Sequence, residues 1–349
     1  MLRRTPLFDK HLALGAKIVP FAGWEMPLSY KSVVAEHQAV RNNAGIFDVS
    51  HMGRITLQGK NAKHVLDYLS TNRILDKQDG QATYTLWCNP LGGTIDDLIA
   101  YQETEDSFFV VANASNREKD FQHLTAHTER AIAQPVYEKE GILAIQGPQA
   151  LALAQSIFPE LLQLKSMHFV KTTFQGIPLY IAATGYTGEK GFEVYAPQEI
   201  LPELWDRFIA AGITPVGLGA RDTLRLEMGY ALYGHELKED RSPLESIAAW
   251  AVKMDKDFLG KDALEAYPKY FPVALAMAEG GIPREGYSIK QKGEILGEVT
   301  SGTFSPSLNQ GIALGRLKKN VQEGEPLAVE IRGKEFPADC VKLPFWRKK

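Results

Sequence analysis

Cysteine is scarce in this chain of 349 residues, which contains only Cys88 and Cys340 and no Cys-x-x-Cys pair. Two cysteines cannot build the disulfide framework of a small secreted domain, and this usage is typical of a reducing cytosol. Long hydrophobic runs are also missing, because no apolar stretch approaches the roughly 20 residues that span a bilayer. The first ten residues, MLRRTPLFDK, lack the apolar core of a signal peptide. We therefore expect a soluble intracellular protein.

An excess of positive charge is absent as well. The 39 Lys and Arg residues are balanced by 42 Asp and Glu residues, and the formal net charge is −3. Proteins that bind nucleic acids or anionic membranes usually carry a basic surface. The charge balance therefore predicts no nucleic-acid partner and no membrane partner.

Several signatures of cofactor and metal sites are missing. Gly217-Leu218-Gly219 lacks the third glycine and the preceding long strand of a dinucleotide fingerprint, and neither a GxxxxGK[ST] loop nor a GxSxG elbow occurs. His123 and His127 lie four residues apart, which fits one face of a helix, but no third ligand lies near them. We expect these two histidines to be solvated helix residues, and we expect no metal.

Strand-like runs and helix-like stretches are mixed along the chain. Strands are expected at 55–58, 108–111, 142–145, 179–182 and 192–195. Helices are expected over 114–127, with Ser115 or Asn116 as the N-cap, and over 202–211, with Gly212 as the stop. Because the order lacks a strict strand–helix–strand rhythm, the sequence predicts the α+β class rather than a doubly wound parallel sheet.

The length predicts two or three domains. LQGKNA (57–62) and IQGPQA (145–150) each end a strand with Gln-Gly and precede an expected helix, which indicates two similar units starting near residues 50 and 140. The tail differs, because hairpins are expected to turn at Lys292-Gly293 and Arg332-Gly333. The predicted domains are two α+β units, at 1–140 and 141–270, and a C-terminal all-β, barrel-like domain at 275–349.

Two adjacent carboxylates, Asp96 and Asp97, follow a glycine pair in GGTIDDLI (92–99). Asp is depleted in strands, but the apolar residues around the pair predict one here. Alternation along a strand sends the two acids to opposite faces, so one is expected to point inward. A buried carboxylate is costly unless it is hydrogen-bonded or chemically needed. The alternatives are therefore a turn followed by a solvent-facing acid, or a carboxylate with a chemical role.

Three further segments are unusual: FAGWEMPLSY (21–30), ATGYTGEKGFEVY (183–195) and GLGARDTLRLEMGYALYG (217–234). Glu193 in the second can accept parallel hydrogen bonds from the adjacent N–H donors of a 2-aminopyrimidinone. Arg221 in the third can present a matching fork to a ring carbonyl or a carboxylate. Flat walls are available from Tyr84, Tyr101 and Tyr186. Each segment alone could be structural, but together they predict a site for a polar heterocycle.

Six motifs, in this order, resemble the glycine cleavage system T protein family, the aminomethyltransferases: TPLFDKHLALGAKIVPFAGWEMPLSY, GIFDVSHMG, GGTIDDLI, GYTGEKGFE, GLGARDTLRLEMG and TSGTFSPSL. The resemblance extends from Thr5 to about Phe345. It implies a three-domain cloverleaf with folate in its central opening. It also implies transfer of a one-carbon unit from the aminomethyl-lipoyl arm of H protein to tetrahydrofolate, which gives 5,10-methylenetetrahydrofolate, ammonia and dihydrolipoyl H protein. Because the family pattern begins at Thr5, a cytoplasmic, bacterial-type protein is expected.

The resemblance also implies roles for individual residues. Asp97 matches the catalytic aspartate of the family, which leaves Asp96 as a turn or supporting group. Glu193 and Arg221 would hold the folate ring. Arg347 would meet the glutamyl tail, although Trp346 stands where the family commonly has Tyr or a small apolar residue. The other expected folate contacts are Met52, Tyr84, Tyr101, Asn113, Tyr186 and Tyr230.

The chemistry gives a carboxylate at Asp97 a purpose. A fixed negative charge stabilises the positive charge that develops on the methylene group as the lipoyl sulfur or the amine departs.

Two related classes of protein are alternatives. A non-catalytic folate-binding protein of iron–sulfur assembly would carry a KGCYxGQE-like signature, where this chain has TGYTGEKGFE. A folate-dependent demethylase would share the folate site, but its flavin-linked members need an extra nucleotide-binding domain, whose fingerprint is missing here. The sequence therefore favours aminomethyl transfer.

Overall fold

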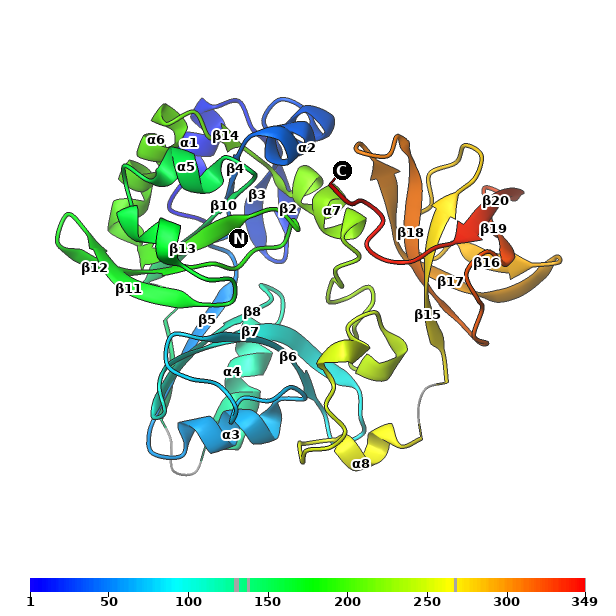
Figure 1. Cartoon of the computed structure of the whole chain (residues 1–349), viewed down its shortest axis with the longest axis horizontal. Helices are drawn as coiled ribbons and strands as arrows, with labels where there is room; N and C mark the ends of the chain where they lie inside the picture. The colour runs from blue at the N-terminus through cyan, green and yellow to red at the C-terminus, as the bar shows by residue number, and fades with distance from the viewer. Residues whose placement is uncertain (129–131, 137–138, 267–268, 349) are drawn as a thin grey trace. The chain divides into compact units, whose positions relative to one another are not determined.

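The computed structural model describes residues 1–128, 132–136, 139–266 and 269–348 (Figure 1). The chain forms two compact units whose segments alternate along the sequence. Unit 1 comprises Met1–Asp67, Arg73–Tyr84 and Leu98–Arg221, and unit 2 comprises Tyr68–Asn72, Thr85–Asp97 and Asp222–Lys349. Two strands, β6 (Ala82–Cys88) and β7 (Thr94–Thr104), pass from one unit to the other.

A six-stranded sheet is the centre of unit 1. Its order is β11-β12-β13-β10-β4-β14, with β14 parallel to β4 and the other pairs antiparallel. The strands are β4 (Gly45–Asp48), β10 (Glu140–Gln146), β11 (Phe169–Phe174), β12 (Ile177–Ala182), β13 (Gly191–Pro197) and β14 (Thr214–Pro215). Leu143 of β10 and Val194 of β13 are paired and buried in one core with Trp205 and Phe208 of α6 (Leu201–Ala210). Because side chains alternate along a strand, Glu193 lies on the opposite face of β13 from this core.

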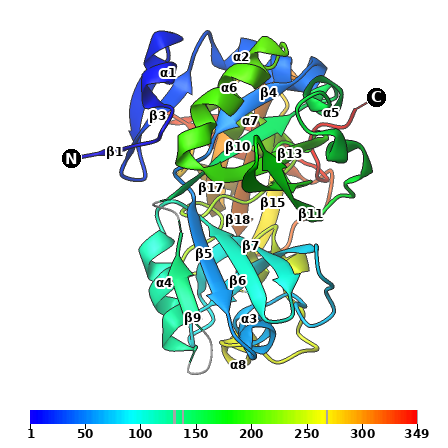
Figure 2. The same ribbon diagram turned by 90° about the vertical axis from the view of Figure 1, so that its left-hand side faces the viewer.

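A second sheet has the order β6-β7-β8-β5-β9. Its remaining strands are β5 (Gly53–Gln58), β8 (Ser107–Ala112) and β9 (Ile132–Pro135). Helix α4 (Arg117–Ala126) lies beside β5 and β9 (Figure 2). Asn116 occupies the expected N-cap position, but its side chain makes no cap hydrogen bond. Leu124 is fully buried, so packing rather than capping holds this helix.

The N-terminal segment adds a small sheet of order β1-β3-β2. Its strands are β1 (Arg3–Arg4), β2 (Lys17–Phe21) and β3 (Trp24–Ser29). Helix α2 (Val33–Asn42) begins after Ser32, whose Oγ accepts a hydrogen bond from the Ala35 N–H at 3.1 Å. The other helical segments are α1 (Phe8–Ala13), α3 (Ala62–Leu69), α5 (Ala150–Ala154), η1 (Pro159–Gln163), η2 (Gln198–Ile200), α7 (Leu218–Glu227), η3 (Pro243–Glu245), η4 (Ala249–Ala251) and α8 (Lys261–Leu264).

Unit 2 contains a closed barrel of order β15-β18-β17-β16-β19-β20 (Figure 1). Its strands are β15 (Phe271–Met277), β16 (Ser288–Gln291), β17 (Glu294–Ser305), β18 (Gln310–Leu317), β19 (Pro326–Ile331) and β20 (Lys334–Cys340). Both expected hairpins are confirmed, with turns at Lys292-Gly293 and Arg332-Gly333. All four turn residues have positive φ, from 52° to 83°, as type I′ turns require. Closure of the barrel removes the open strand edges that invite aggregation.

The repeated Gln-Gly pattern has the same backbone geometry at both of its positions. β5 leads into α3 and β10 leads into α5, each through a glycine with a positive φ of 137° at Gly59 and 140° at Gly147. In both turns the glycine carbonyl accepts a hydrogen bond from the first helical residue, at 2.8 Å and 3.1 Å. The expected local similarity of the two segments is therefore confirmed at these turns.

The α+β class with a C-terminal barrel is confirmed. β4 lies within the predicted first domain but pairs with β10 of the second, because the sheet around β10 takes in this earlier strand. The barrel begins at Phe271, slightly before the expected 275. The boundaries of the three predicted domains stay a prediction. Among the helices that the structure describes, none is long and apolar enough to cross a membrane.

Candidate functional site

Glu193 is held by three hydroxyl groups in unit 1. Its Oε2 atom accepts hydrogen bonds from Thr184 Oγ1 at 2.5 Å, Tyr195 OH at 2.7 Å and Tyr101 OH at 3.5 Å. Tyr195 follows Glu193 by two residues on β13 and therefore lies on the same face of the strand. Within the described residues, Glu193 Oε1 makes no hydrogen bond. The carboxylate is fixed through one oxygen and presents the other as an acceptor.

Tyr101 is fully enclosed by protein. Its ring stacks on Phe109, with centroids 4.4 Å apart and an interplanar angle of 10°, and its hydroxyl lies 2.7 Å from the hydroxyl of Tyr195. Burial, followed by the nearby charge of Glu193, raises the pKa of Tyr101 well above its usual value, so the hydroxyl stays protonated. The expected contact of Tyr101 with a ligand stays a prediction, whereas its hydroxyl supports Glu193 directly.

Arg221 lies over the ring of Tyr186. Its guanidinium carbon is 4.7 Å from the ring centroid, which is a cation–π distance. Burial lowers the pKa of Arg221, and the hydroxyl of Tyr186 and the carboxylate of Glu193 oppose that effect. An arginine stays charged under such a shift at neutral pH. The structure therefore brings together three of the predicted residues: Tyr186, Glu193 and Arg221.

His51 lies in the same surroundings and was not among the predicted site residues. It is 2% exposed, and its ring contacts the ring of Phe21 edge-on at a centroid distance of 5.6 Å. Burial, and then the positive charges of Arg221 and Arg117, lower the pKa of His51 to about 3, with Asp48 opposing. His51 is therefore neutral at pH 7. Within the described residues its Nδ1 atom has no hydrogen-bond partner.

The acid pair lies in unit 2, at the start of β7. The expected strand and its alternation are confirmed, because Asp96 is 0% exposed whereas Asp97 is partly exposed. Asp96 lies inside the strand rather than in a turn, so that part of the expectation is wrong. The turn comes earlier, at 89–93, where the carbonyl of Asn89 accepts a hydrogen bond from Gly92 N–H at 2.9 Å.

This turn explains the glycine pair before the acids. Asn89 Oδ1 accepts from the N–H groups of Leu91 and Gly93, at 2.9 Å and 3.0 Å, and its Nδ2 donates to the carbonyl of Glu239 at 3.0 Å. A Cβ atom on Gly93 would stand 1.7 Å from that same Glu239 carbonyl oxygen. Gly92 has a φ of 81°. Only glycine lets the backbone approach this closely and turn in this way.

The remaining predicted contacts lie in both units. Unit 1 holds three half-buried residues, Met52, Tyr84 and Asn113. In unit 2, Tyr230 is 37% exposed, and the exposed Arg347 donates through Nη2 to the carbonyl of Leu343 at 3.3 Å. Their roles as folate contacts stay predictions.

Two charged residues of α7 link this helix to the barrel. Arg225 donates to Ser301 Oγ at 2.9 Å and to Glu236 Oε2 at 3.2 Å. Glu227 is fully buried and accepts from Ser305 Oγ at 2.5 Å and from Ser307 Oγ at 2.9 Å. The serines of the TSGTFSPSL motif therefore have a structural role in unit 2.

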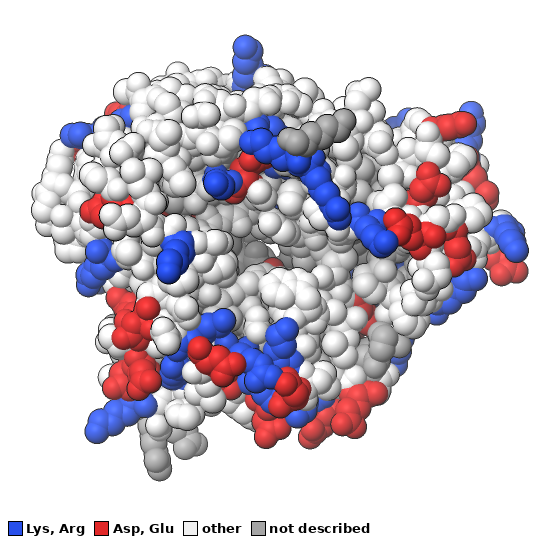
Figure 3. Space-filling model, in the orientation of Figure 1, with Lys and Arg blue, Asp and Glu red and all other residues white. Residues whose placement is uncertain are grey.

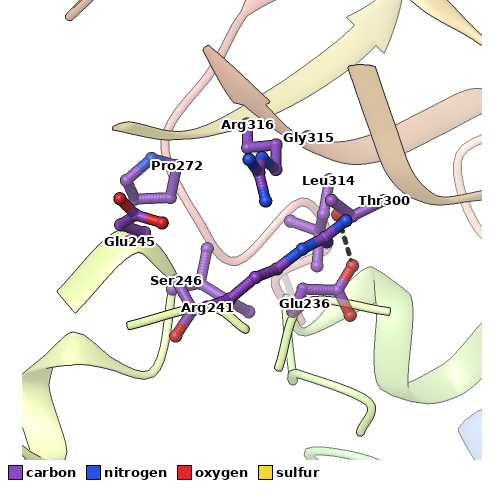
Figure 4. Close-up of a pocket in the computed structure, with 10 residues that line it drawn as sticks. Glu236, Arg241, Glu245, Ser246, Pro272, Thr300, Leu314, Gly315 and Arg316 are labelled. Carbon is purple, nitrogen blue, oxygen red and sulfur yellow. Dashed lines mark hydrogen bonds between the residues drawn. The ribbon is translucent and has the colours of Figure 1, made fainter. Parts of the chain in front are cut away.

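A pocket of about 290 Å³, part of it open to solvent, lies beside the barrel in unit 2. Figure 4 shows Arg241 extending across it, while the Thr300 hydroxyl donates to Glu236 Oε1 at 2.5 Å. Arg316 also lines the pocket, with its guanidinium 3.7 Å from the ring centroid of Tyr270. None of the predicted site residues lines this pocket.

The described part of the chain contains no group of three or more His, Cys, Asp or Glu side chains placed to hold a metal ion. His123 lies on α4 and His127 just after it, with ring centroids 4.9 Å apart, and His127 Nδ1 lies 2.8 Å from the carbonyl oxygen of His123.

On the face shown in Figure 3, basic and acidic side chains are interspersed.

Two family models match the sequence: the GCVT N-terminal domain over residues 7–256, and the glycine cleavage T-protein C-terminal barrel domain over residues 272–346. The chain belongs to the glycine cleavage T-protein family. The aminomethyltransferases of Desulforamulus reducens and Bacillus velezensis are each 45% identical to it, over 99% and 100% of this chain and 99% of each relative. The crystal structure of glycine cleavage system aminomethyltransferase T from Bartonella henselae matches 99% of this chain and 98% of its own, with a TM-score of 0.93 and 33% identity.

These matches confirm the resemblance carried by the six motifs and identify a transferase of the aminomethyltransferase family. The sequence-based prediction did not include two residues of this chain that hold Glu193. Tyr195 could have been found, because a residue two positions from Glu193 on a strand shares its face. Thr184 lies in the glycine-rich loop, and only the folded loop brings its hydroxyl to Glu193.

Proposed function

We propose that this T-protein family member transfers a one-carbon unit from the aminomethyl-lipoyl arm of H protein to tetrahydrofolate. The sulfur–methylene and methylene–amine bonds break, and two carbon–nitrogen bonds to the folate form. The two protons lost from the folate nitrogens go to the lipoyl sulfur and to the amine. The products are 5,10-methylenetetrahydrofolate, ammonia and dihydrolipoyl H protein.

The observation that carries this proposal is the arrangement around Glu193. Three hydroxyl groups hold Oε2, and Oε1 remains an acceptor. The 2-aminopyrimidinone edge of a folate presents adjacent N–H donors, which the two lone pairs of Oε1 can accept. Arg221, which lies over Tyr186, adds a cationic fork and a flat surface beside it. The residues that the structure describes here therefore fit a folate ring.

Asp97 is proposed as the carboxylate that acts on the transferred carbon. It is partly exposed, whereas its neighbour Asp96 is fully buried. A strand is a rigid element, so the carboxylate is held in place before any ligand arrives. In a site that excludes water, it would stabilise the positive charge that develops on the methylene and accept a hydrogen bond from a folate N–H. Asp96 would support the strand from inside.

The reaction run in reverse tests the proposal. The protein is supplied with 5,10-methylenetetrahydrofolate, ammonia and dihydrolipoyl H protein, and mass spectrometry detects aminomethylated H protein. Product from the wild type, and none from Asp97→Asn with folate binding retained, supports the proposal. Tight folate binding without product would favour the demethylase alternative. No folate binding at all would contradict the proposal.

A further inference from the structure

Gln146, the last residue of β10, fills the space beneath the loop at 183–190 that joins β12 to β13. It is 1% exposed. Its Nε2 atom donates to the carbonyls of Thr184 at 3.2 Å and Ile145 at 3.1 Å, and its Oε1 accepts from Thr187 Oγ1 at 3.0 Å. Both polar atoms of this amide are therefore hydrogen-bonded inside the protein.

The glycines at the two ends of this loop lie close to the Gln146 side chain. A Cβ atom on Gly185 would stand 2.0 Å from Gln146 Oε1. One on Gly191 would stand 2.3 Å from the carbonyl oxygen of Ile145 and 2.6 Å from Gln146 Nε2. Neither position has a φ in the left-handed region. Gly185 is therefore needed to make room for the amide, and Gly191 to make room for both the amide and the backbone of β10, rather than for a special backbone conformation.

A second buried side chain holds the loop from α2. Arg41 is 4% exposed, and its Nη1 donates to the carbonyl of Thr187 at 2.7 Å and to Glu189 Oε1 at 3.1 Å. Thr187 is thus held through its hydroxyl by Gln146 and through its carbonyl by Arg41. The segment between Thr184 and Thr187, which carries Tyr186, is fixed at both ends.

From these contacts we propose that Gln146 is a positioning residue for the folate-binding groups. The path runs from its amide to the Thr184 carbonyl, and from the Thr184 hydroxyl to Glu193 Oε2 at 2.5 Å. The same amide fixes Thr187, one residue beyond Tyr186. Gln146 therefore prepares Glu193 and Tyr186 for the ligand without touching it. The inference rests on the proposed folate site.

Gln146→Met tests the role, because methionine keeps the length of the side chain and removes its hydrogen bonds. We expect tetrahydrofolate binding, measured by calorimetry, to weaken about tenfold. The KM for tetrahydrofolate should rise by a similar factor, while kcat at saturating folate changes less than twofold. Gln102→Met is the matched control, since Gln102 is also a buried glutamine of unit 1, but its Nε2 donates to Asp79 at 2.9 Å, away from the loop. The control should bind folate as the wild type does.

Coupling separates positioning from general loss of structure. If Gln146 acts through Glu193, Gln146→Met should weaken binding much less in a Glu193→Gln background than in the wild type. Equal effects in both backgrounds would overturn the proposal, as would unchanged binding in folded Gln146→Met. Failure of the wild type to bind tetrahydrofolate would instead refute the proposed function.

If Gln146→Met does not fold, Thr187 provides the same test. Thr187→Val removes the hydroxyl that donates to Gln146 Oε1, and Thr187→Ser keeps it. The proposal requires weaker folate binding in Thr187→Val and near-normal binding in Thr187→Ser. Equal affinities for the two variants would contradict it.

Discussion

The hydroxyl of Tyr195 donates a hydrogen bond to the carboxylate of Glu193 at 2.7 Å, and the two residues lie two positions apart on the same strand, β13. Burial, and then the charge of Glu193, raise the pKa of Tyr195 well above its usual value, so this donor persists at every physiological pH. The strand thus supplies both Glu193, which is proposed to recognise the folate ring, and one of the groups that orient it.

Tyr195→Phe removes that donor and keeps the ring. We expect about fivefold weaker folate binding, because a hydrogen bond to a charged group contributes roughly 1–3 kcal/mol and two other hydroxyls remain on Oε2. Calorimetric titration measures the affinity. Tyr180→Phe is a suitable control, since the hydroxyl of Tyr180 donates to Glu103 rather than to Glu193. A weaker effect from Tyr195→Phe than from the control would contradict this assignment.

Asp97→Asn and Asp96→Asn should separate chemistry from stability. Asp97 is partly exposed, and we expect Asp97→Asn to lower the activity at least a hundredfold with little change in Tm. The reason is that the substitution removes an electrostatic group at the proposed reacting centre. Asp96 is fully buried, and we expect Asp96→Asn instead to lower the free energy of unfolding by roughly 1–3 kcal/mol. Paired activity and thermal-unfolding measurements distinguish the two. A large fall in Tm for Asp97→Asn would make the acid structural.

The free energy of unfolding should fall as the pH drops from about 6.5, because of His51. Its pKa is about 3 in the folded chain, against 6.5 as the ordinary value. Between these values the unfolded chain binds a proton that the folded chain does not, so acid favours unfolding. Between pH 7.5 and pH 5 the expected loss is about 2 kcal/mol, from the linkage relation.

Urea unfolding at both pH values measures this loss. His51→Gln cannot take up the proton and should lose about 2 kcal/mol less than the wild type over the same interval. Asp48 does not confound the comparison. Burial raises its pKa, but hydrogen bonding to His11 and the charge of His11 lower it further, so the net pKa lies below its usual value. A His51 ring titrating near pH 6.5 by NMR would refute the argument.

Gly93→Ala should destabilise unit 2 strongly. The added Cβ would lie 1.7 Å from the backbone carbonyl oxygen of Glu239, and backbone cannot move aside as a flexible side chain can. We expect a loss of roughly 3 kcal/mol or more, read as a lower Tm. Asn89→Ala removes the side chain that holds the same turn and should lower Tm to a smaller extent. An unchanged Tm in Gly93→Ala would contradict the close approach.

Much of the local structure followed from periodicity and turn chemistry. The β16–β17 and β19–β20 hairpins were predictable because their X-Gly pairs can adopt positive φ at both positions. The burial of one acid in β7 followed from alternation. The insertion of β4 beside β10 was not predictable, because strand pairing between distant segments depends on how whole faces pack rather than on either segment.

The sequence by itself determined the family, the short-range elements and the residues proposed for the site, because motifs, strand alternation and turn preferences all act over a few neighbouring positions. Only the tertiary structure decided what orients those residues. The Glu193 carboxylate is oriented by Tyr101, and the loop before it by Gln146 and Arg41, through contacts between segments that are far apart along the chain. Hydrogen bonds of this kind form only after folding has closed the intervening loops, so no local sequence pattern predicts them.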